Sequence, residues 1–340
     1  MPTSQNSARA FVYRAGVRIA GTVVACDAAA GGDLVFLSHA AVFGAHGRRA
    51  LPRVGGGRRQ ILTTEATLAL LGPVGERLRA RALLAPFGRP FVLGDLRLEI
   101  FPSGYQPGAA SLLCERGGKR SVYAGPLGPA AEVRAADALC LDARYAERDV
   151  AFPERVVAEE NLRRIAADAS TGGAPLLYVE PLALAPLVAR ALAGAGLPLR
   201  AHRRILDALA AYRRVEPAAP VPAVQRFAGR LAEREVLLWP ADARAPAPGQ
   251  TRGRRRVFVS PRAASATVRA RPDGLGKMEA LVFPFGADAA ALVRYAEAAG
   301  AAEVALASAP DEHLAELLRG RGIDVYRIGS PRQIDLFARG

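Results

Sequence analysis

The chain is poor in the residue types that most often carry metal or redox chemistry. Its 340 residues include three cysteines, four histidines, two methionines and one tryptophan. The cysteines, Cys26, Cys114 and Cys140, stand far apart in apolar, strand-like surroundings, and none belongs to a C-x-x-C pair. We therefore predict three buried free thiols rather than a redox or zinc motif.

Long apolar runs are also missing. No stretch of about 18 uninterrupted apolar residues occurs, as a membrane-spanning helix would need. The first residues, MPTSQNSARAFVYRAG, lack the compact apolar core of a secretory signal. Because 51% of the residues are apolar, the chain can build the core of one large domain or two ordinary ones. We expect a globular, soluble, cytoplasmic protein.

Positive charge is abundant but of one kind. The formal net charge is +14, and Lys119 and Lys277 are the only lysines, so nearly all of the charge is arginine. Such an excess favours a polyanionic partner, because basic side chains that neutralise phosphates release counterions. The chain is equally rich in Ala, Gly and Pro, a profile typical of GC-rich coding. The charge therefore leaves open whether the arginine excess is functional.

The first 150 residues have the sequence pattern of a β-rich region, in which short apolar runs are separated by Gly, Pro and Asp. One helix is predicted over 63–72, because threonines precede an apolar periodic stretch that closes on Gly72. The predicted strands cover 17–26, 33–39, 89–94, 96–102, 110–116, 120–125 and 138–143.

From about Glu154 the pattern changes to alternating helices and strands. Such alternation predicts parallel β-α-β units, unlike the region before it. The segment 241–276 is rich in Pro, Gly and Arg and reads as a boundary or a surface loop. The predicted elements are helices over 153–170, 182–196, 203–215, 287–300 and 311–322 and strands over 172–181, 197–202, 279–286, 303–308 and 323–329.

Several motifs follow one another in a recognisable order. VVACD is followed by DLVFLSHAAVFGAH, by LTTEATLALL, by PSGYQPGAAS and by VYAGPLG. LCLDARYAERDVAFPE and GGAPLLYVEPLALAPLVARAL come next, then GLPLRAHRRILDALAAYRR and finally VFPFGADAAALVRYAEAAGAAEVALAS. This order resembles the metallo-β-lactamase fold with an inserted β-CASP cap. It is most similar to the DNA ligase-associated exonucleases, also described as mRNA 3′-end processing exonuclease-like proteins. The similarity runs from about Gly16 to Tyr326.

The resemblance implies an α/β fold, a metallo-β-lactamase-like αββα sandwich with a β-CASP-like α/β cap inserted into it. It implies three segments: 1–150 as the first part of the sandwich, 151–275 as the cap and 276–340 as the return to the sandwich. The family's two-metal hydrolases need about seven nitrogen or oxygen ligands and an open position for water.

The ligands of that metal centre are missing here. His39 matches the first histidine of the family's H-x-H-x-D-H motif. At the positions of the other histidine ligands and of the bridging aspartate, this chain has other residues. His202 and His313 fit no ligand position. The degenerate positions are Ala41, Phe43, Gly44, Tyr105, Pro126, Gly286 and Ser308.

Three aspartates of the framework survive, namely Asp27, Asp142 and Asp288. Such acids hydrogen-bond neighbouring loops or orient ligands, so they can brace turns without a metal. The alternative is a rebuilt single-metal site for zinc or manganese, with Asp27, His39 and Asp142 as weak remnant candidates and His46 as a further ligand. We expect no catalytic residue and no cofactor.

Three functions remain open. The first is a pseudoenzyme, an inactive β-CASP-type nuclease that binds nucleic acid or acts as a scaffold in DNA repair or RNA processing. Its partners would be DNA or RNA, an active β-CASP paralogue, a DNA ligase or a helicase, with no membrane. The basic run TRGRRR would supply the nucleic-acid contacts and face the interdomain cleft through Arg252, Arg254, Arg255 and Arg256.

The second function is a hydrolase that keeps weak chemistry through the rebuilt metal site. The third is a purely structural protein-interaction module, in which the apolar replacements Phe43 and Phe285 close the cleft. The three functions stay open at this point, because a fold does not by itself imply a function.

Overall fold

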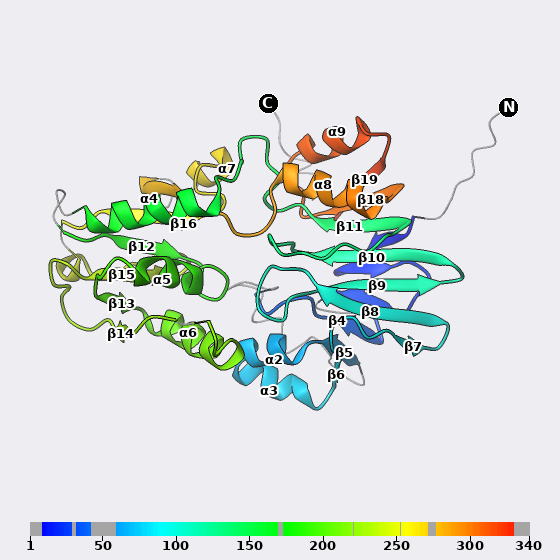
Figure 1. Cartoon of the computed structure of the whole chain (residues 1–340), viewed down its shortest axis with the longest axis horizontal. Coiled ribbons are helices and arrows are strands. Elements are labelled where there is room, and N and C mark those ends of the chain that lie inside the picture. The colour runs from blue at the N-terminus through cyan, green and yellow to red at the C-terminus, as the bar shows by residue number, and fades with distance from the viewer. Residues whose placement is uncertain are drawn as a thin grey trace, which may run out of the picture.

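The computed structural model describes residues 9–28, 32–41, 59–168, 173–219, 221–251, 253–270 and 277–329. Within these residues the chain is a mixed α/β structure with three sheets (Figure 1). The residues Phe43, Gly44, His46 and Arg252, which the sequence analysis singles out, lie outside the described part. No described helix has the length and apolar character to cross a membrane.

The first sheet has the strand order β1-β2-β3-β4-β5-β6. Pairing is antiparallel from β1 to β3 and parallel from β3 to β6. The helices α2 (Glu65–Leu71) and α3 (Pro73–Arg79) connect β5 to β6. The strands are β1 (Phe11–Tyr13), β2 (Val17–Ile19), β3 (Val24–Cys26), β4 (Leu34–Phe36), β5 (Gln60–Thr63) and β6 (Ala82–Leu84).

One predicted strand is in fact two. The run 17–26 is divided into β2 and β3 by a turn at Gly21, which has φ of +69°. The Thr22 hydroxyl donates a 2.9 Å hydrogen bond to the carbonyl of Ile19 and so closes that turn. The prediction was wrong because the apolar run continues through the turn, and only the glycine marks the reversal.

The second sheet has the order β19-β18-β11-β10-β9-β8-β7. Its antiparallel half is β7 to β10, and β10, β11, β18 and β19 pair in parallel. The helices α8 (Ala289–Ala299) and α9 (His313–Arg319) lie beside β18 and β19 in the sequence. The strands are β7 (Phe91–Leu93), β8 (Leu96–Pro102), β9 (Ala110–Arg116), β10 (Lys119–Gly125), β11 (Ala138–Asp142), β18 (Glu303–Ala307) and β19 (Asp324–Ile328).

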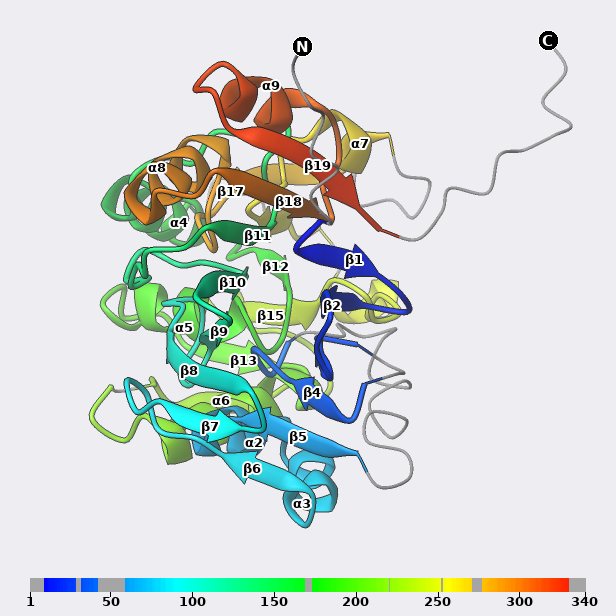
Figure 2. The same cartoon turned by 90° about the vertical axis from the view of Figure 1, so that its right-hand side faces the viewer.

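These two sheets face each other in a four-layer sandwich (Figure 2). A shared apolar core, which includes Phe36, Leu98 and Leu112, lies between them. A second core joins the first sheet to α2 and α3, and a third joins the second sheet to α8 and α9. The order of layers is therefore helices, sheet, sheet, helices.

All three cysteines lie in the core between the two sheets, and all are free and buried. The prediction of buried free thiols is confirmed. Burial raises the pKa of Cys114 to about 11 and the pKa values of Cys26 and Cys140 well above the usual range. These thiols therefore stay protonated and unreactive at neutral pH.

The third sheet is parallel throughout, with the order β14-β13-β15-β12-β16-β17. The predicted parallel α/β arrangement is confirmed for this segment. Its helices are α4 (Arg155–Ala167), α5 (Ala185–Ala193), α6 (Arg203–Val215) and α7 (Ala266–Arg269), with a short 3-10 helix η2 (Pro248–Gln250). Its strands are β12 (Leu176–Val179), β13 (Leu199–Ala201), β14 (Val224–Arg226), β15 (Val236–Pro240), β16 (Arg256–Ser260) and β17 (Glu279–Val282).

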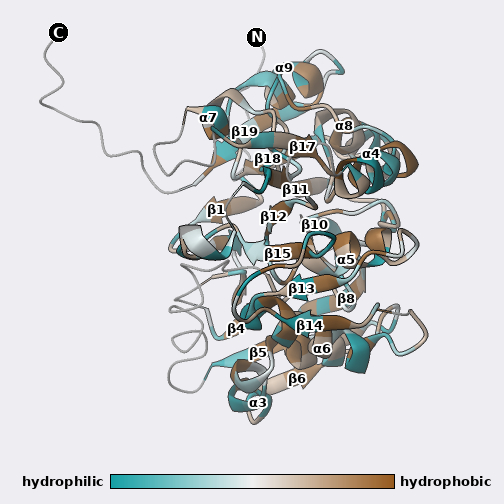
Figure 3. Ribbon diagram, turned by 90° about the vertical axis from the view of Figure 1, so that its left-hand side faces the viewer, coloured by the Kyte–Doolittle hydropathy of each residue, from teal (hydrophilic) through white to brown (hydrophobic). Residues whose placement is uncertain are grey.

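Helices α4, α5 and α6 share one apolar core with the third sheet, and α7 packs on the opposite face. Figure 3 shows strands such as β17 as mostly hydrophobic and helix α3 as largely hydrophilic. Since β17 pairs with β16, the third sheet extends to Val282, beyond residue 275 where the sequence analysis ends the cap.

The third sheet is inserted between two neighbouring strands of the second. The chain leaves the second sheet after β11 and returns in β18, which pairs with β11 so that Asp142 lies opposite Ala307. Gln106 ties the two parts together. Its amide oxygen accepts from the backbone of Ala41, and its amide nitrogen donates to the carbonyl of Leu182 and to the hydroxyl of Tyr212 on α6.

Helix α2 begins and ends as the sequence predicts, and its start also holds a loop. Thr64 caps α2 by accepting from the backbone of Thr67, and Gly72 ends the helix. The hydroxyls of Thr64 and Thr67 both donate to the carbonyl of Gly108, at 2.7 and 2.9 Å. Thr64 and Thr67, which form a T-x-x-T pattern, therefore anchor the loop that carries Tyr105.

We predict that Thr64→Ala lowers the free energy of unfolding by about 1–2 kcal/mol, because it removes the helix cap and one bond to the loop. Thr64→Ser keeps the hydroxyl and is expected to remain close to the original stability. Urea unfolding of the two variants measures the difference. Equal destabilisation by Ser and Ala would show that the methyl group, not the hydroxyl, matters.

Candidate functional site

A cavity of about 260 Å³ lies between the third sheet and the sandwich. Its far wall is formed where strands of the third sheet end: Glu180 follows β12, Ala241 follows β15, and Ser260 closes β16. The carboxyl ends of parallel strands are where open α/β sheets most often bind ligands. The remaining lining residues are Ala41, Tyr105, Arg144, Tyr145, Ala183, Leu184, Phe258, Val259, Pro261 and Phe285.

The near wall is formed by degenerate motif positions. Tyr105 is 6% exposed, and its ring centroid lies 4.2 Å from that of Phe285. The ring of His39 meets Tyr105 edge to face at 5.2 Å between centroids. Ala41 lies in the same wall. Positions far apart in the sequence, where the resemblance expects metal ligands, are thus gathered around one cavity.

Gly286 shows why a ligand side chain has no room here. Its backbone has φ of +93°, a conformation that favours glycine, and a Cβ atom would lie 2.7 Å from the ring of Tyr145. The same added atom would lie 3.5 Å from Tyr105. Two tyrosine rings therefore occupy the space that a histidine at position 286 would need.

Two other degenerate positions, Pro126 and Ser308, do not line this cavity. Pro126 is buried and follows Gly125, where an added Cβ would meet the side chain of Ser38 at 3.2 Å. Ser308 follows β18 directly and has φ of +57°. Phe43 and Gly44 are outside the described residues, so their positions relative to the cavity stay predictions.

Asp27 is the centre of a buried polar network beneath the cavity. It accepts hydrogen bonds from the Ser38 backbone at 2.8 Å, from the Ser38 hydroxyl at 2.5 Å and from the Tyr123 hydroxyl at 2.9 Å. Burial raises the pKa of Asp27 from 3.8 to about 6, although these donors lower it. Asp27 thus braces the ends of β3 and β4 and has no oxygen without a hydrogen bond.

His39 is buried as a neutral ring. Its Nδ1 lies 2.8 Å from the Ser38 hydroxyl oxygen, whose single hydrogen is donated to Asp27. Nδ1 therefore donates its hydrogen to the Ser38 oxygen, and Nε2 is left as a buried acceptor that has no partner among the described residues. Burial lowers the pKa of His39 well below its usual value, and the nearby charge of Arg144 lowers it further.

Asp142 forms an ion pair with Arg144. Its Oδ2 accepts from Nε of Arg144 at 2.9 Å and from Nη2, and its Oδ1 accepts from the Arg144 backbone at 3.2 Å. The Asp142 side chain is 7% exposed and that of Arg144 is 32% exposed. The guanidinium therefore lies between the carboxylate and the cavity, where the resemblance expects a metal.

Asp288 is a structural residue. It caps α8 by accepting from the backbone of Ala291 at 2.9 Å, and its other oxygen accepts from the backbone of Phe152 at 3.1 Å. Phe152 belongs to the segment that leads into the third sheet, and Asp288 to the segment that leads out of it. The carboxylate therefore joins the two connections between the sandwich and the inserted sheet.

The residues of this site do not fit a metal centre. Over the described ranges, no three His, Cys, Asp or Glu side chains are gathered so that they could hold an ion. Asp27 is saturated by hydroxyl and amide donors, and Asp142 is paired with a guanidinium. The weak remnant candidates are therefore engaged in other interactions, and His46, the fourth candidate, lies outside the described residues.

The basic run lies at the wrong end of its strand to face the cavity. Arg256 begins β16, whereas Ser260 at the other end of β16 lines the cavity. Arg254 donates to the carbonyls of Ala174 and Glu233 at 2.8 and 2.6 Å and also to that of Ala232. The expected placement of this run beside the interdomain cleft is corrected, because all strands of the third sheet point their carboxyl ends at the cleft.

Arg255 is also engaged, in ion pairs with Asp168 at 2.8 Å and with Glu279 at 2.7 Å. Of the described arginines in the run, Arg256 is exposed and Arg254 and Arg255 are partly buried. Nucleic-acid binding by this run stays a prediction, and Arg252 lies outside the described residues.

The remaining described histidines have structural positions. His202 caps α6, since its Nδ1 accepts from the backbone of Arg204 at 3.1 Å, and its ring meets Trp239 at 4.6 Å between centroids. His313 is the first residue of α9. Neither residue lines the cavity.

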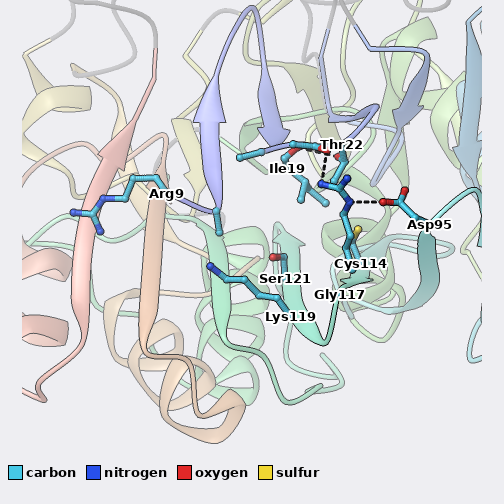
Figure 4. A pocket seen from close by; sticks show the side chains of 12 residues that line it. Arg9, Ile19, Thr22, Asp95, Cys114, Gly117, Lys119 and Ser121 are labelled. Carbon is cyan, nitrogen blue, oxygen red and sulfur yellow. Dashed lines mark hydrogen bonds and ion pairs between the residues drawn. The ribbon is translucent and has the colours of Figure 1, made fainter. Parts of the chain in front are cut away.

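A larger hollow of about 640 Å³ lies on another side of the sandwich, between the β1–β2 region and the β9–β10 hairpin (Figure 4). Its arginines are engaged: Arg116 donates to Asp95 at 2.5 Å and to the Gly21 carbonyl at 2.9 Å, and Arg9 pairs with Asp324. Of the degenerate motif positions that the structure describes, none lines this hollow. The smaller cavity is therefore the better candidate site.

Sequence reasoning missed three residues of the candidate site: Arg144, Tyr145 and Glu180. The first two lie in LDARYAERD, directly after the strand that ends in Asp142. The sequence did contain a signal for Arg144, namely an arginine two residues after that aspartate. The two side chains form a local ion pair. No protein-family model matches this sequence, and no curated protein matches it either.

The raised pKa of Asp27 makes stability depend on pH. The folded state binds the proton more tightly than the unfolded chain, so this contribution is fully present below about pH 3.8 and is lost as the pH rises through about 6. We predict that the original protein loses up to about 3 kcal/mol relative to Asp27→Asn between pH 4 and pH 7.

Asparagine is a suitable control residue, because it does not titrate and tolerates the positive φ of 49° at this position. Urea unfolding of both proteins at pH 4, 5, 6 and 7 measures the difference, in which the other titrating groups cancel. A difference that stays constant over this range would contradict the raised pKa.

Proposed function

We propose that the chain is a degenerate protein of the metallo-β-lactamase and β-CASP architecture that binds nucleic acid without hydrolysing it, as a subunit or scaffold in DNA or RNA processing. One observation carries this proposal. A cavity lies between the two parts, and aromatic rings and an arginine ion pair are found at positions where the resemblance expects metal ligands or their neighbours.

The arrangement of layers supports the proposed architecture. Two sheets lie between two layers of helices, and a parallel α/β unit is inserted between β11 and β18. Asp27 and Ser308, both positions of the family framework, are among the described non-glycine residues with positive φ. Strained backbone of this kind clusters at functional sites, so its presence here is consistent with a former active site.

The packing around the cavity supports a loss of hydrolysis. A metal-dependent nuclease activates water on an ion that several protein ligands hold. Here the Tyr105 and Phe285 rings are in contact, and Gly286 has no space for a larger side chain. Restoring one ligand by substitution would therefore disturb the aromatic packing before it created a site.

A basic groove beside the cavity supports binding of nucleic acid. This groove, of about 420 Å³, lies between α6 and the junction of α2 and α3. Arg203 and Arg214 line it, both are exposed, and neither forms an ion pair among the described residues. Helix α6 carries four arginines and one aspartate, and Arg204 is paired with Asp242.

The geometry of α6 suits an extended polyanion. Arg203 and Arg214 are eleven residues apart on the same face, with Asp207 between them, so they are separated by about 16 Å along the helix axis. Leu182 lines the groove, and the next two residues, Ala183 and Leu184, line the cavity. A single strand in the groove would therefore pass close to the entrance of the cavity.

We predict that the purified protein contains no stoichiometric zinc or manganese and does not cleave single-stranded DNA or RNA when either metal is added. Mass spectrometry of metal content and a nuclease assay on labelled oligonucleotides measure both properties. A stoichiometric metal together with cleavage would establish the rebuilt metal site instead, with Asp27, His39 and Asp142 as its first candidates.

We also predict that Arg203→Gln/Arg214→Gln weakens binding of a single-stranded oligonucleotide about tenfold at low salt. Each lost phosphate contact should reduce the slope of log affinity against log salt by about 0.7. Fluorescence anisotropy over a range of salt concentrations measures both effects.

The matched control is Arg234→Gln/Arg294→Gln, which removes the same charge from exposed residues that do not line the groove and do not belong to the basic run. It is expected to bind as the original protein does. If both double variants lose affinity equally, binding follows net charge and not the groove. If the original protein binds no oligonucleotide, the chain is better explained as a protein-interaction module.

A further inference from the structure

Arg144 presents one unused edge of its guanidinium at the cavity. Its Nε and Nη2 donate to Asp142, and within the described ranges Nη1 donates no hydrogen bond. The side chain lines the cavity and is 32% exposed. A planar guanidinium with free N–H groups is well suited to bind a phosphate oxygen.

The position of this cation is held before any ligand arrives. Asp142 accepts hydrogen bonds from the backbone and from the side chain of Arg144, so both the backbone and the guanidinium of the arginine are held in place. Asp142 itself is the last residue of β11, in the middle of the second sheet. A group that is already ordered loses little conformational entropy when a ligand binds.

The rest of the cavity wall is largely aromatic. Tyr105, Tyr145, Phe258 and Phe285 line it. Aromatic side chains of this kind stack on nucleobases or pack against sugars. The volume of about 260 Å³ is just below the range of about 300–1,000 Å³ that is typical of small-molecule sites, so it suits one small ligand.

Glu180 restricts which ligand fits. Its carboxylate lines the same cavity and accepts from the backbone of Leu182 at 3.2 Å and of Ala183. An anion without hydrogen-bond donors would share the cavity with this carboxylate and could not donate to it. A nucleoside phosphate carries sugar hydroxyls or base amino groups as donors, whereas a bare phosphate ion at neutral pH has few.

We propose that this cavity is a binding site for one phosphorylated nucleoside, whose phosphate lies on Nη1 of Arg144 and whose base or sugar lies on the aromatic wall. The proposal rests on the proposed function, because the nucleotide belongs either to the end of a bound strand or to a free mononucleotide. It adds a specific ligand site, in which an arginine with its aspartate partner occupies the former place of the metal.

The test compares nucleoside 5′- and 3′-monophosphates with the matching nucleosides and with inorganic phosphate, by isothermal titration calorimetry on the full chain. A nucleoside monophosphate is expected to bind at least tenfold more tightly than either the nucleoside or inorganic phosphate. Competition with oligonucleotides whose ends do or do not carry phosphate then distinguishes a strand end from a free nucleotide as the source.

Two variants are chosen to remove the phosphate contact without unfolding the protein. Arg144→Lys keeps the charge and loses the fork, and Asp142→Asn/Arg144→Gln replaces the ion pair by a neutral pair, so that no unpaired carboxylate is left. Both are expected to weaken nucleoside monophosphate binding at least tenfold and to unfold cooperatively on heating. Arg234→Gln/Arg294→Gln, whose residues do not line the cavity, is the control that should bind the monophosphate unchanged.

The outcomes separate this inference from the proposed function. Loss of monophosphate binding in the Arg144 variants, with oligonucleotide binding on α6 retained, supports the site. Oligonucleotide binding by the original protein without any monophosphate binding, or with binding that the Arg144 variants keep, overturns the site and leaves the proposed function intact. Monophosphate binding without oligonucleotide binding supports the site and overturns the proposed function.

Discussion

The ion pair between Asp142 and Arg144 is the interaction on which the rest of the site depends. Asp142 ends the strand from which the chain departs to build the third sheet, and β18 returns beside it. A carboxylate in this nearly buried position needs a partner, because an unpaired buried charge is costly. Arg144 supplies that partner from two residues away, so the carboxylate is satisfied without a metal. The guanidinium in turn raises the local positive potential, which favours a neutral His39 and an anionic ligand over a second cation.

Aromatic side chains pack around the same cavity as this ion pair. Tyr105 and Phe285 are in contact across the cleft, and Tyr145 occupies the space above Gly286. Each of these side chains comes from a different segment of the chain, and together they make the described lining of the cavity largely apolar around Arg144. In the proposed function, the shape of this cavity and the charge of Arg144 serve to recognise a nucleotide. The polar network of Asp27, Ser38 and Tyr123 supports the floor of the cavity and is satisfied within itself.

Some features were predictable because their causes are local. Thr64 and Gly72 cap α2 where the sequence places them, and the alternation after Glu154 produces the parallel third sheet. The division of 17–26 into two strands was missed, because an apolar run hides a turn at Gly21. The loss of the metal ligands could be proposed from residue identity alone, since Ala41, Tyr105 and Gly286 do not bind zinc. That these positions meet around one cavity could not, because they lie on separate elements of two sheets.

The sequence by itself determined which residue types are scarce, where helix α2 is capped, and which residues are apolar enough to be buried, since these depend on residue identity and short-range spacing. Only the tertiary structure decided which charges remain available. Arg254 satisfies three backbone carbonyls and Arg255 two carboxylates, whereas Arg203 and Arg214 remain exposed beside the cavity. In the sequence these arginines look alike. They differ in the folded chain because strand direction and register place one group among carbonyls at the far end of a sheet and the other at the rim of a groove.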